Sequence, residues 1–344
     1  MERLMFKNPE KNHRKLNIML SVLMAVLAMI GICSCGKTEE DSGFNGNWII
    51  GTGSSTGNYY NFGSVLCDVV NEVTGANIAV CSTGGSTENA RQLGTGEIRL
   101  ALIQSDVLSY AATGTEIFAG SEISNISVIT CCYPEMVQLV VRADSGIQSV
   151  EDLRGKKVCV GDIGSGYEVA ARQILDVYGM SYGDIEESFD EQSAGREGIM
   201  DGTYDAMILC SGYPNSNVTQ MAESGIIELI SIDKEHLKLL TEKYPFYTVY
   251  EAGRDEENGC YNLGHSVSSV AVMSMMVCTD DFTENQIYTL TKAIYENLDE
   301  IKKLNGKAEY MSLQTAFDGV PVKLHKGAVK YYEEVGLSVP ENLK

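Results

Sequence analysis

The chain has 344 residues, of which 47 are Asp or Glu and 26 are Lys or Arg, and its formal net charge at pH 7 is −21. A surface this negative repels nucleic acid and offers no basic patch to hold it, which excludes a nucleic-acid-binding protein. The length is sufficient for a leader and two domains with real hydrophobic cores.

The N-terminus has the order of a secretory signal peptide over residues 1–35. Basic side chains come first, an uncharged apolar run follows from Leu16, and small residues end it. The ending ICSCG resembles the lipobox of bacterial lipoproteins and predicts lipidation of Cys35, with Cys33 as the alternative. An uncleaved transmembrane anchor is the other interpretation, since the run approaches the roughly 20 residues that span a bilayer. Both interpretations place the body in the periplasm or on the outer face of the cytoplasmic membrane, after a linker at residues 36–46.

Strand and helix signals alternate from residue 47 onward. The run NWIIGTG predicts a strand that ends in a glycine turn, and apolar residues from Phe62 to Val73 predict a helix that ends at Gly75. NIAVC, RLALIQ and the long apolar segment ISVITCCYPEMVQLVVRA predict further strands, with a short helix through ENARQL. This alternation is typical of an α/β fold whose mostly parallel strands are flanked by helices.

A second series of the same kind begins near Ser149. KKVCVG predicts a strand, the turn DIGSG follows, and a helix with apolar positions from Ala170 to Tyr178 ends at Gly179. DAMILC and IIELIS predict more strands, and SSVAVMSMMVCT predicts a long return strand that only helices follow.

Two α/β series in tandem predict two lobes. Residues 47–138 begin lobe 1, residues 139–265 form lobe 2, and residues 266–344 supply a return strand and C-terminal helices that complete lobe 1. We expect the return strand and the long strand between Val128 and Val141 to connect the lobes and to act as a hinge.

Three turns share one arrangement, in which a strand runs into Gly, Ser and Thr residues and a helix begins at once. They are GTGSSTG at residues 51–57, STGGST at residues 82–87 and DIGSG at residues 162–166. Glycine allows close backbone approach, and a helix N-terminus presents unpaired N–H groups to a carboxylate. Such turns are also ordinary helix caps. Because ligands collect at the carboxyl ends of parallel strands, we expect a cleft between the lobes to receive all three turns.

Other chemistries find little support. The first turn resembles a dinucleotide fingerprint, but the next strand ends without the acid that would hold a ribose. The four histidines have no ligand-like spacing. We expect no cofactor, no metal and no catalytic residue, and hence no enzyme. Most of the cysteines after the leader lie in apolar contexts and are interpreted as small buried hydrophobes, with disulfides left open.

The motifs GTGSSTGNYY, STGGSTENARQLGTGEIRLALIQSD and LRGKKVCVGDIGSG, with DGTYDAMIL, resemble the TAXI family of TRAP transporter solute receptors. The resemblance covers roughly residues 47–337. It implies a two-lobed periplasmic-binding-protein fold of type II, with two crossing strands, that closes on a solute and delivers it to a membrane permease. It also implies the ligand-binding residues Gly53, Ser54, Thr56, Tyr59, Thr83, Gly84, Ser86, Asn89, Gln104, Ser165 and Gly166.

The resemblance further implies the solute and the partners. The solute is expected to be a small carboxylate such as glutamate, glutamine or a dicarboxylate, and the partners are the permease subunits of a TRAP transporter and, through the N-terminal anchor, the membrane. Tyr59 or Tyr60 would cover the apolar part of the solute, whereas Thr87 and Asn89 have helix capping as an alternative role. Arg254, in a loop that does not match the family, is either a ligand cation or a solvated charge. A sensor that partners a membrane kinase or chemoreceptor, and an exported enzyme, remain the alternative functions.

Overall fold

The structure is a computed structural model that describes residues 46–344. The signal peptide, lipidation of Cys35 or Cys33, and nearly all of the linker lie outside the described residues. Within residues 46–344, no helix combines the length and hydropathy needed to cross a membrane.

The strands of the described chain form one 10-stranded sheet in the order β2-β1-β3-β10-β4-β7-β5-β6, with β8 paired to β4 and β9 to β10. The strands are β1 Asn47–Gly51, β2 Asn77–Cys81, β3 Leu100–Gln104, β4 Ile126–Arg142, β5 Lys157–Cys159, β6 Glu186–Ser188, β7 Ala206–Ser211, β8 Ile227–Ile230, β9 Thr248–Ala252 and β10 Val267–Thr279.

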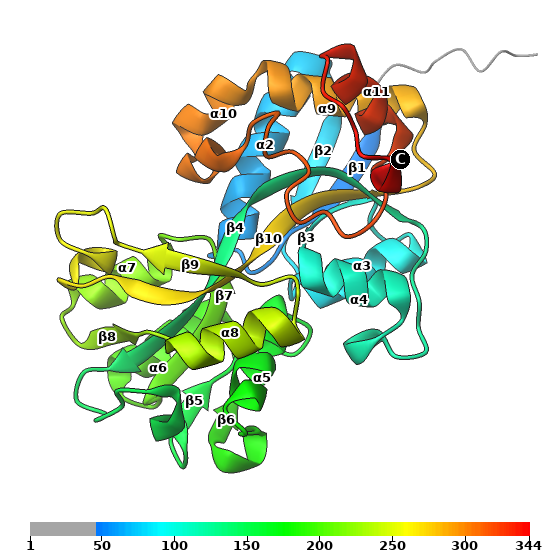
Figure 1. Ribbon diagram of the computed structural model, residues 1–344. Helices are drawn as coiled ribbons and strands as arrows, with labels where there is room; N and C mark the ends of the chain where they lie inside the picture. The colour runs from blue at the N-terminus through cyan, green and yellow to red at the C-terminus, as the bar shows by residue number, and fades with distance from the viewer. Residues whose placement is uncertain (1–45) are drawn as a thin grey trace, which may run out of the picture. The chain divides into compact units, whose positions relative to one another are not determined.

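The helices follow the strands in the predicted alternation and lie on the faces of this sheet (Figure 1). The α-helices are α2 Asn58–Thr74, α3 Ser86–Thr95, α4 Ser105–Thr113, α5 Gly166–Val177, α6 Gln192–Asp201, α7 Ser216–Glu223, α8 Lys234–Lys243, α9 Glu284–Glu296, α10 Leu298–Leu304 and α11 Lys326–Glu334. Short 3-10 turns include η1 Glu116–Phe118 and η5 Gly306–Tyr310.

The two long strands β4 and β10 belong to both lobes. They pair with each other antiparallel, and each then continues into a different set of neighbours. At one end β10 pairs with β3, and at the other end with β9. The far half of β4 pairs with β7 and β8. Figure 1 shows both strands running from the upper group of elements to the lower one, which confirms the predicted fold of two lobes joined by crossing strands.

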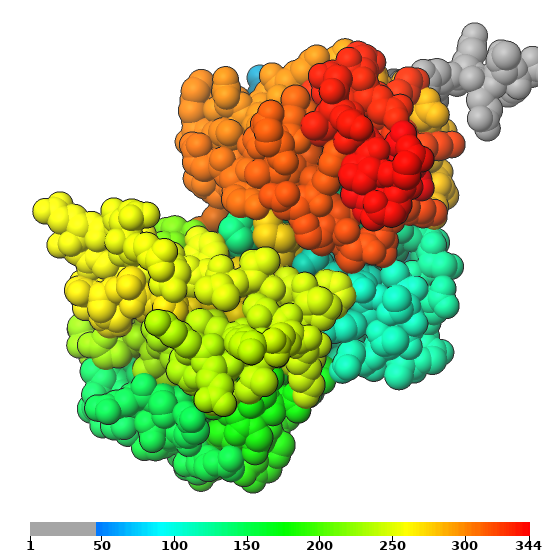
Figure 2. All heavy atoms as spheres, viewed as in Figure 1, coloured from blue at the N-terminus to red at the C-terminus, as the bar shows by residue number. Residues whose placement is uncertain are grey.

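Each lobe has its own hydrophobic core. In lobe 1 the core combines β1 to β3 and α2 to α4 with the C-terminal helices α9 and α11, and the C-terminal segments are massed on this lobe in Figure 2. In lobe 2 alternate residues of β7 enter two different cores: Ile208 packs with α5 on one face, and Met207 packs with α7 on the other. This alternation follows from the period of two along a strand. The predicted lobe boundaries remain predictions.

Every cysteine in the described part of the chain is a free thiol, and all except Cys81 are buried. Their burial agrees with the interpretation of these residues as small core hydrophobes.

Phe62 offers a direct test of the lobe 1 core. Its ring is fully buried on α2 and packs edge-on against Tyr133, with the ring centroids 5.0 Å apart. We expect Phe62→Ala to lower the free energy of unfolding by about 3–5 kcal/mol, because it leaves a cavity at the contact with β4. Urea unfolding measures this loss. The control is Val73→Ala on the same helix, where the side chain is 50% exposed and the change should stay within about 0.5 kcal/mol.

Candidate functional site

The N-termini of several helices meet in one pocket between the lobes. Helices α2, α3 and α4 arrive from lobe 1 and α5 and α6 from lobe 2, and each begins just after a strand ends. This is the edge where ligands collect in parallel α/β sheets. The pocket is lined by Gly53, Ser54, Gly57, Tyr59, Gly84, Gly85, Ser86, Gln104, Glu135, Asp162, Ser165, Gly166, Tyr167 and Gln192.

The lobes are closed upon each other around this pocket. Ser54 donates a hydrogen bond to Glu191 at 2.9 Å, and the Asn58 side chain donates to the Gly212 carbonyl at 2.7 Å. The backbone N–H of Glu88 donates to the carbonyl of Gly164 at 3.3 Å. The pocket holds about 20 Å³ of free volume, which is room for about one water. A solute therefore requires the lobes to separate before it enters.

The lobes also approach each other closely at Gly166, the first residue of α5. A methyl group built there would lie 1.4 Å from Oε1 of Gln104. In the closed arrangement, any side chain at this position therefore requires the Gln104 amide to move.

Gln104 ends β3 with its side-chain amide in the pocket. The residue is 2% exposed, and neither Oε1 nor Nε2 has a hydrogen-bond partner within the described structure. A buried amide without partners costs free energy, and such groups call for a ligand or a water to satisfy them. Gln104 therefore has free donors and a free acceptor in the pocket.

Glu135, on β4, is the one pocket residue that the long connecting strands contribute. It follows Pro134, where the pairing of β4 with β10 shifts register in a β-bulge, and bulges commonly redirect side chains beside sites. Glu135 is 2% exposed, and Tyr59 donates a hydrogen bond to its carboxylate at 2.7 Å. Burial raises the pKa of Glu135 to about 8, although Tyr59, Gln104 and the charge of Lys307 act in the opposite direction.

The titratable residues among the pocket lining are acids and tyrosines. Glu135 and Asp162 line it, and none of its described lining residues is Lys or Arg. Burial also raises the pKa of Asp162 above its usual range. Lys307 lies close enough to influence Glu135, but its ammonium donates to the carbonyl of Pro214, and burial lowers its own pKa to about 8.

Most of the predicted ligand residues line this pocket. They are Gly53, Ser54, Tyr59, Gly84, Ser86, Gln104, Ser165 and Gly166. Ser165 also caps α5, because its hydroxyl accepts a hydrogen bond from the N–H of Glu168 at 3.2 Å. Their role as ligands remains a prediction.

Thr83, Asn89 and Thr56 lie elsewhere. The Asn89 side chain donates to the carbonyls of Thr52 and Leu102, at 2.7 and 2.9 Å, and accepts from the Thr83 hydroxyl at 2.7 Å. These contacts connect the ends of β1 and β3 to α3. Asn89 and Thr83 therefore stabilise the turn before α3 from outside the pocket. Thr56 is exposed beside Ser54.

Three further residues lie outside the pocket lining. Tyr60 is half-buried on α2, and the hydroxyl of Thr87 is buried without a partner in the described structure. Arg254 is exposed and pairs with Glu251 at 3.4 Å, as expected of a solvated loop charge.

Sequence patterns did not identify Glu135, Tyr167 or Gln192 as pocket residues. Tyr167 and Gln192 follow the same strand-turn-helix rule as the predicted residues, and this rule could have found them. Glu135 has a weaker signal, which is a single acid inside the long apolar run ITCCYPEMVQLVV.

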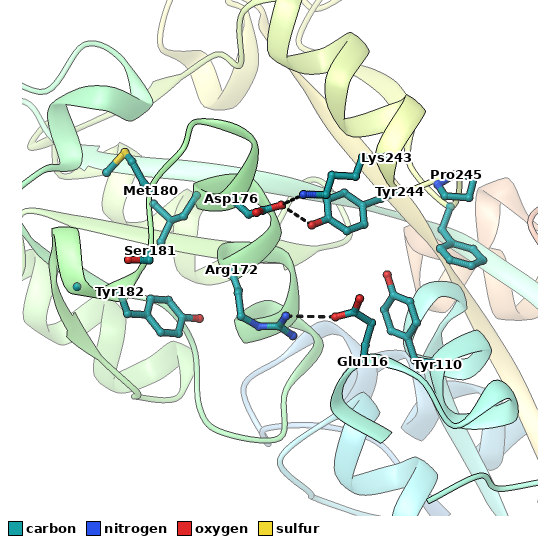
Figure 3. A pocket seen from close by; sticks show the side chains of 13 residues that line it. Tyr110, Glu116, Arg172, Asp176, Met180, Ser181, Tyr182, Lys243, Tyr244 and Pro245 are labelled. Atoms are coloured by element: carbon teal, nitrogen blue, oxygen red, sulfur yellow. Dashed lines mark hydrogen bonds and ion pairs between the residues drawn. The ribbon is translucent and has the colours of Figure 1, made fainter. Parts of the chain in front are cut away.

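A much larger cavity lies elsewhere in the described chain. It has a volume of about 780 Å³ and is bordered by Tyr110 and Glu116 of lobe 1 and by residues of α5 and α8. Its charged groups are already paired: Arg172 contacts Glu116 at 3.5 Å, and Asp176 accepts from Lys243 and Tyr244 (Figure 3). This groove receives no predicted ligand residue. In the described part of the chain, no group of His, Cys, Asp and Glu side chains could hold a metal ion.

Glu135 predicts a pH dependence of stability. Its carboxyl ionises near pH 4.5 in the unfolded chain and near pH 8 in the folded one, so stability falls as pH rises through this window and levels off above it. Glu135→Gln cannot ionise and should be more stable than the parent at pH 8, by up to about 4 kcal/mol, with little difference at pH 4.5.

Urea unfolding without solute from pH 4.5 to pH 8 measures this difference. The pKa of Asp106 is also raised by burial, to about 6, but this group is present in both proteins, so its contribution largely cancels. A constant difference across the pH range would contradict the assignment.

Solved structures with the same architecture were found at low sequence identity. A protein from Bordetella bronchiseptica RB50 is 18% identical, with a TM-score of 0.52 over 88% of this chain and 87% of that one. PhnD1 from Prochlorococcus marinus MIT 9301, solved with methylphosphonate, is 13% identical, with a TM-score of 0.52 over 75% and 89%. The periplasmic binding protein BugD is 12% identical, with a TM-score of 0.52 over 84% and 97%. These likenesses confirm the fold.

The family indicated by the motifs was wrong. The family model that matches residues 50–336 is described as NMT1-like, and this match overturns the resemblance to the TAXI receptors of TRAP transporters. The motifs were misleading because glycine and serine turns before helices are demanded by the geometry of the cleft, and thus recur among families that share this fold. Matched over most of its length, the chain belongs to the NMT1-like family.

Proposed function

We propose that this protein is an extracytoplasmic solute-binding protein of a membrane transporter and that it closes two lobes around a small solute bearing a carboxylate. The observation that carries the proposal is the convergence of helix N-termini from both lobes on one pocket that contains the unpaired amide of Gln104.

The capping of the helices supports an anionic group at this pocket. Helices α2, α3, α4 and α6 begin there without a side-chain cap. In contrast, α7, α8, α9 and α11 are capped by the side chains of Asn215, Asp233, Thr283 and His325. Uncapped N-termini leave N–H donors and a positive dipole end for a ligand. The hydroxyl of Ser86, which accepts a hydrogen bond from the backbone N–H of Gln104, adds a donor beside them.

The connecting strands and the contacts between lobes support capture by closure. Strands β4 and β10 cross between the lobes, and bending there would open the pocket while most of each core stays packed. A solute that contacts α2 and α3 of one lobe and α5 of the other would stabilise the closed state over the open one.

Two classes of anionic solute are candidates for the pocket. Glutamate, glutamine and dicarboxylates lose the support that the family resemblance gave them. The complex of PhnD1 with methylphosphonate makes a phosphonate the second candidate, since uncapped helix N-termini also suit that anion. The leader favours export and a transporter partner in the membrane, whereas the absence of enzymatic activity remains a prediction. A sensor with the same closing lobes is the alternative function.

A thermal-shift screen of residues 36–344 tests the proposal. Amino acids, dicarboxylates, methylphosphonate, sugars and nucleotides are the compounds to compare. We expect a higher melting temperature with a carboxylate-bearing compound, because a ligand that binds only the folded, closed state stabilises it. Small-angle scattering should show that the same compound reduces the radius of gyration. Tight binding without compaction would rule out closure of the lobes, and stabilisation by nucleotides alone would overturn the proposed solute class.

Gly166→Ala tests whether the closed arrangement binds the solute. The added methyl group would overlap Gln104, so we expect the affinity for the solute to fall by about tenfold or more while the ligand-free melting temperature changes little. Gly306→Ala is the matched control, because nothing lies within 4 Å of a methyl group at that position. Equal affinities of the two variants, measured by calorimetry, would remove α5 from the site.

A further inference from the structure

We propose that Glu135, Tyr59 and Gln104 bind an ammonium group of the solute, so that the protein selects small zwitterions over simple anions. This inference rests on the proposed function, in which the helix N-termini bind the carboxylate. It adds a second subsite, at the opposite end of the solute, that recognises a positive charge.

The three residues present acceptors that match an ammonium group. A primary ammonium has three N–H donors and no acceptor. The Glu135 carboxylate supplies one acceptor, the free Oε1 of Gln104 a second, and the hydroxyl oxygen of Tyr59 a third, since its proton is already donated to Glu135 at 2.7 Å. All three residues line the same pocket and are buried.

The electrostatics of the pocket point the same way. A simple anion would lie next to Glu135 and Asp162 without a Lys or Arg among the lining residues. In a water-poor pocket an anion is repelled by each ionised acid and keeps Glu135 in its protonated form, whereas an ammonium is attracted to the ionised Glu135 carboxylate. Lys307 offsets part of the negative charge, but its ammonium is directed to the Pro214 carbonyl. A zwitterion satisfies both ends of the pocket, because its carboxylate lies at the helix N-termini and its ammonium at Glu135.

Binding of the ammonium has a measurable proton balance. Burial holds the pKa of Glu135 at about 8, so the carboxyl is mostly protonated at pH 7 before the solute enters. An adjacent ammonium favours the ionised form, and the proton leaves Glu135 for the buffer. The groups that face Glu135 and influence this balance are Tyr59 of α2, Asp106 of α4, Tyr133 of β4, Tyr167 of α5, Cys210 of β7 and Lys307 of η5. Lys307 also titrates near pH 8, and a bound cation favours its neutral form, which adds to the release.

Matched pairs of compounds test the inference on residues 36–344. The pairs are L-alanine with propionate, L-glutamate with glutarate, and γ-aminobutyrate with butyrate, and methylphosphonate completes the panel. We expect an amine-bearing member to bind about tenfold or more tightly than its partner without the amine. Calorimetry at pH 7 in two buffers of different ionisation enthalpy should report release of about one proton per solute.

Glu135→Gln identifies the group that releases the proton. This variant should lose the proton release and about tenfold or more of the affinity for the amine-bearing solute. Glu97→Gln, at an exposed acid of lobe 1, makes the same change of charge and should bind like the parent. Tyr59→Phe removes one acceptor and should weaken the amine-bearing member more than its partner.

The outcomes separate the inference from the proposed function. One outcome is that propionate, glutarate or methylphosphonate compacts the protein and binds it as tightly as the amine-bearing compounds do. That result would preserve the solute-binding function and overturn the ammonium subsite. Unchanged proton release in Glu135→Gln would also overturn it. If no member of the panel binds, the carboxylate-binding function and the subsite both fail.

Discussion

The antiparallel pairing of β4 with β10 is the constraint on which the rest of the structure depends. These two strands are the only described ones that carry hydrogen bonds into both lobes, so they hold two separately packed cores in one sheet. Each core is built mainly from apolar residues on its own helices and strands, although Val169 of α5 packs with the lobe 1 core. The cleft can therefore open by bending at two strands, with little loss of buried apolar area.

The same pairing determines what the floor of the cleft contains. Close to the crossing, the register of β4 against β10 shifts at a bulge just before Pro134 and Glu135. Proline tolerates such a position because a bulge leaves its ladder hydrogen bond unmade. The bulge directs an acid into a pocket whose walls are helix N-termini. The pocket consequently has a positive potential from backbone dipoles at its walls and a titratable carboxyl at its floor, which together favour a solute with both charges.

Binding and stability oppose each other at Glu135 and Gln104. An apolar or amide side chain in place of Glu135 would avoid the cost of burying an ionisable carboxyl, and an apolar residue in place of Gln104 would avoid the unpaired amide. Residues that reduce stability in a closed, water-poor pocket are typical of sites where a ligand supplies the missing partners. Asn89 shows the contrast, because its side chain is just as buried but has every polar atom paired within the turn.

The sequence by itself determined the alternation of strands and helices, the two long connecting strands and the turns that contain Ser54, Ser86 and Ser165. These features depend on local periodicity and on glycine, which act over a few residues. Tertiary structure alone decided that Glu135 faces the pocket, that Asn89 supports the turn from outside and that Gly166 meets Gln104. These outcomes depend on contacts between residues far apart in the chain and on a bulge that shifts the register of β4, and no local pattern encodes either. The motifs also failed to identify the family, because the glycine turns reflect a cleft geometry that many families of this fold share.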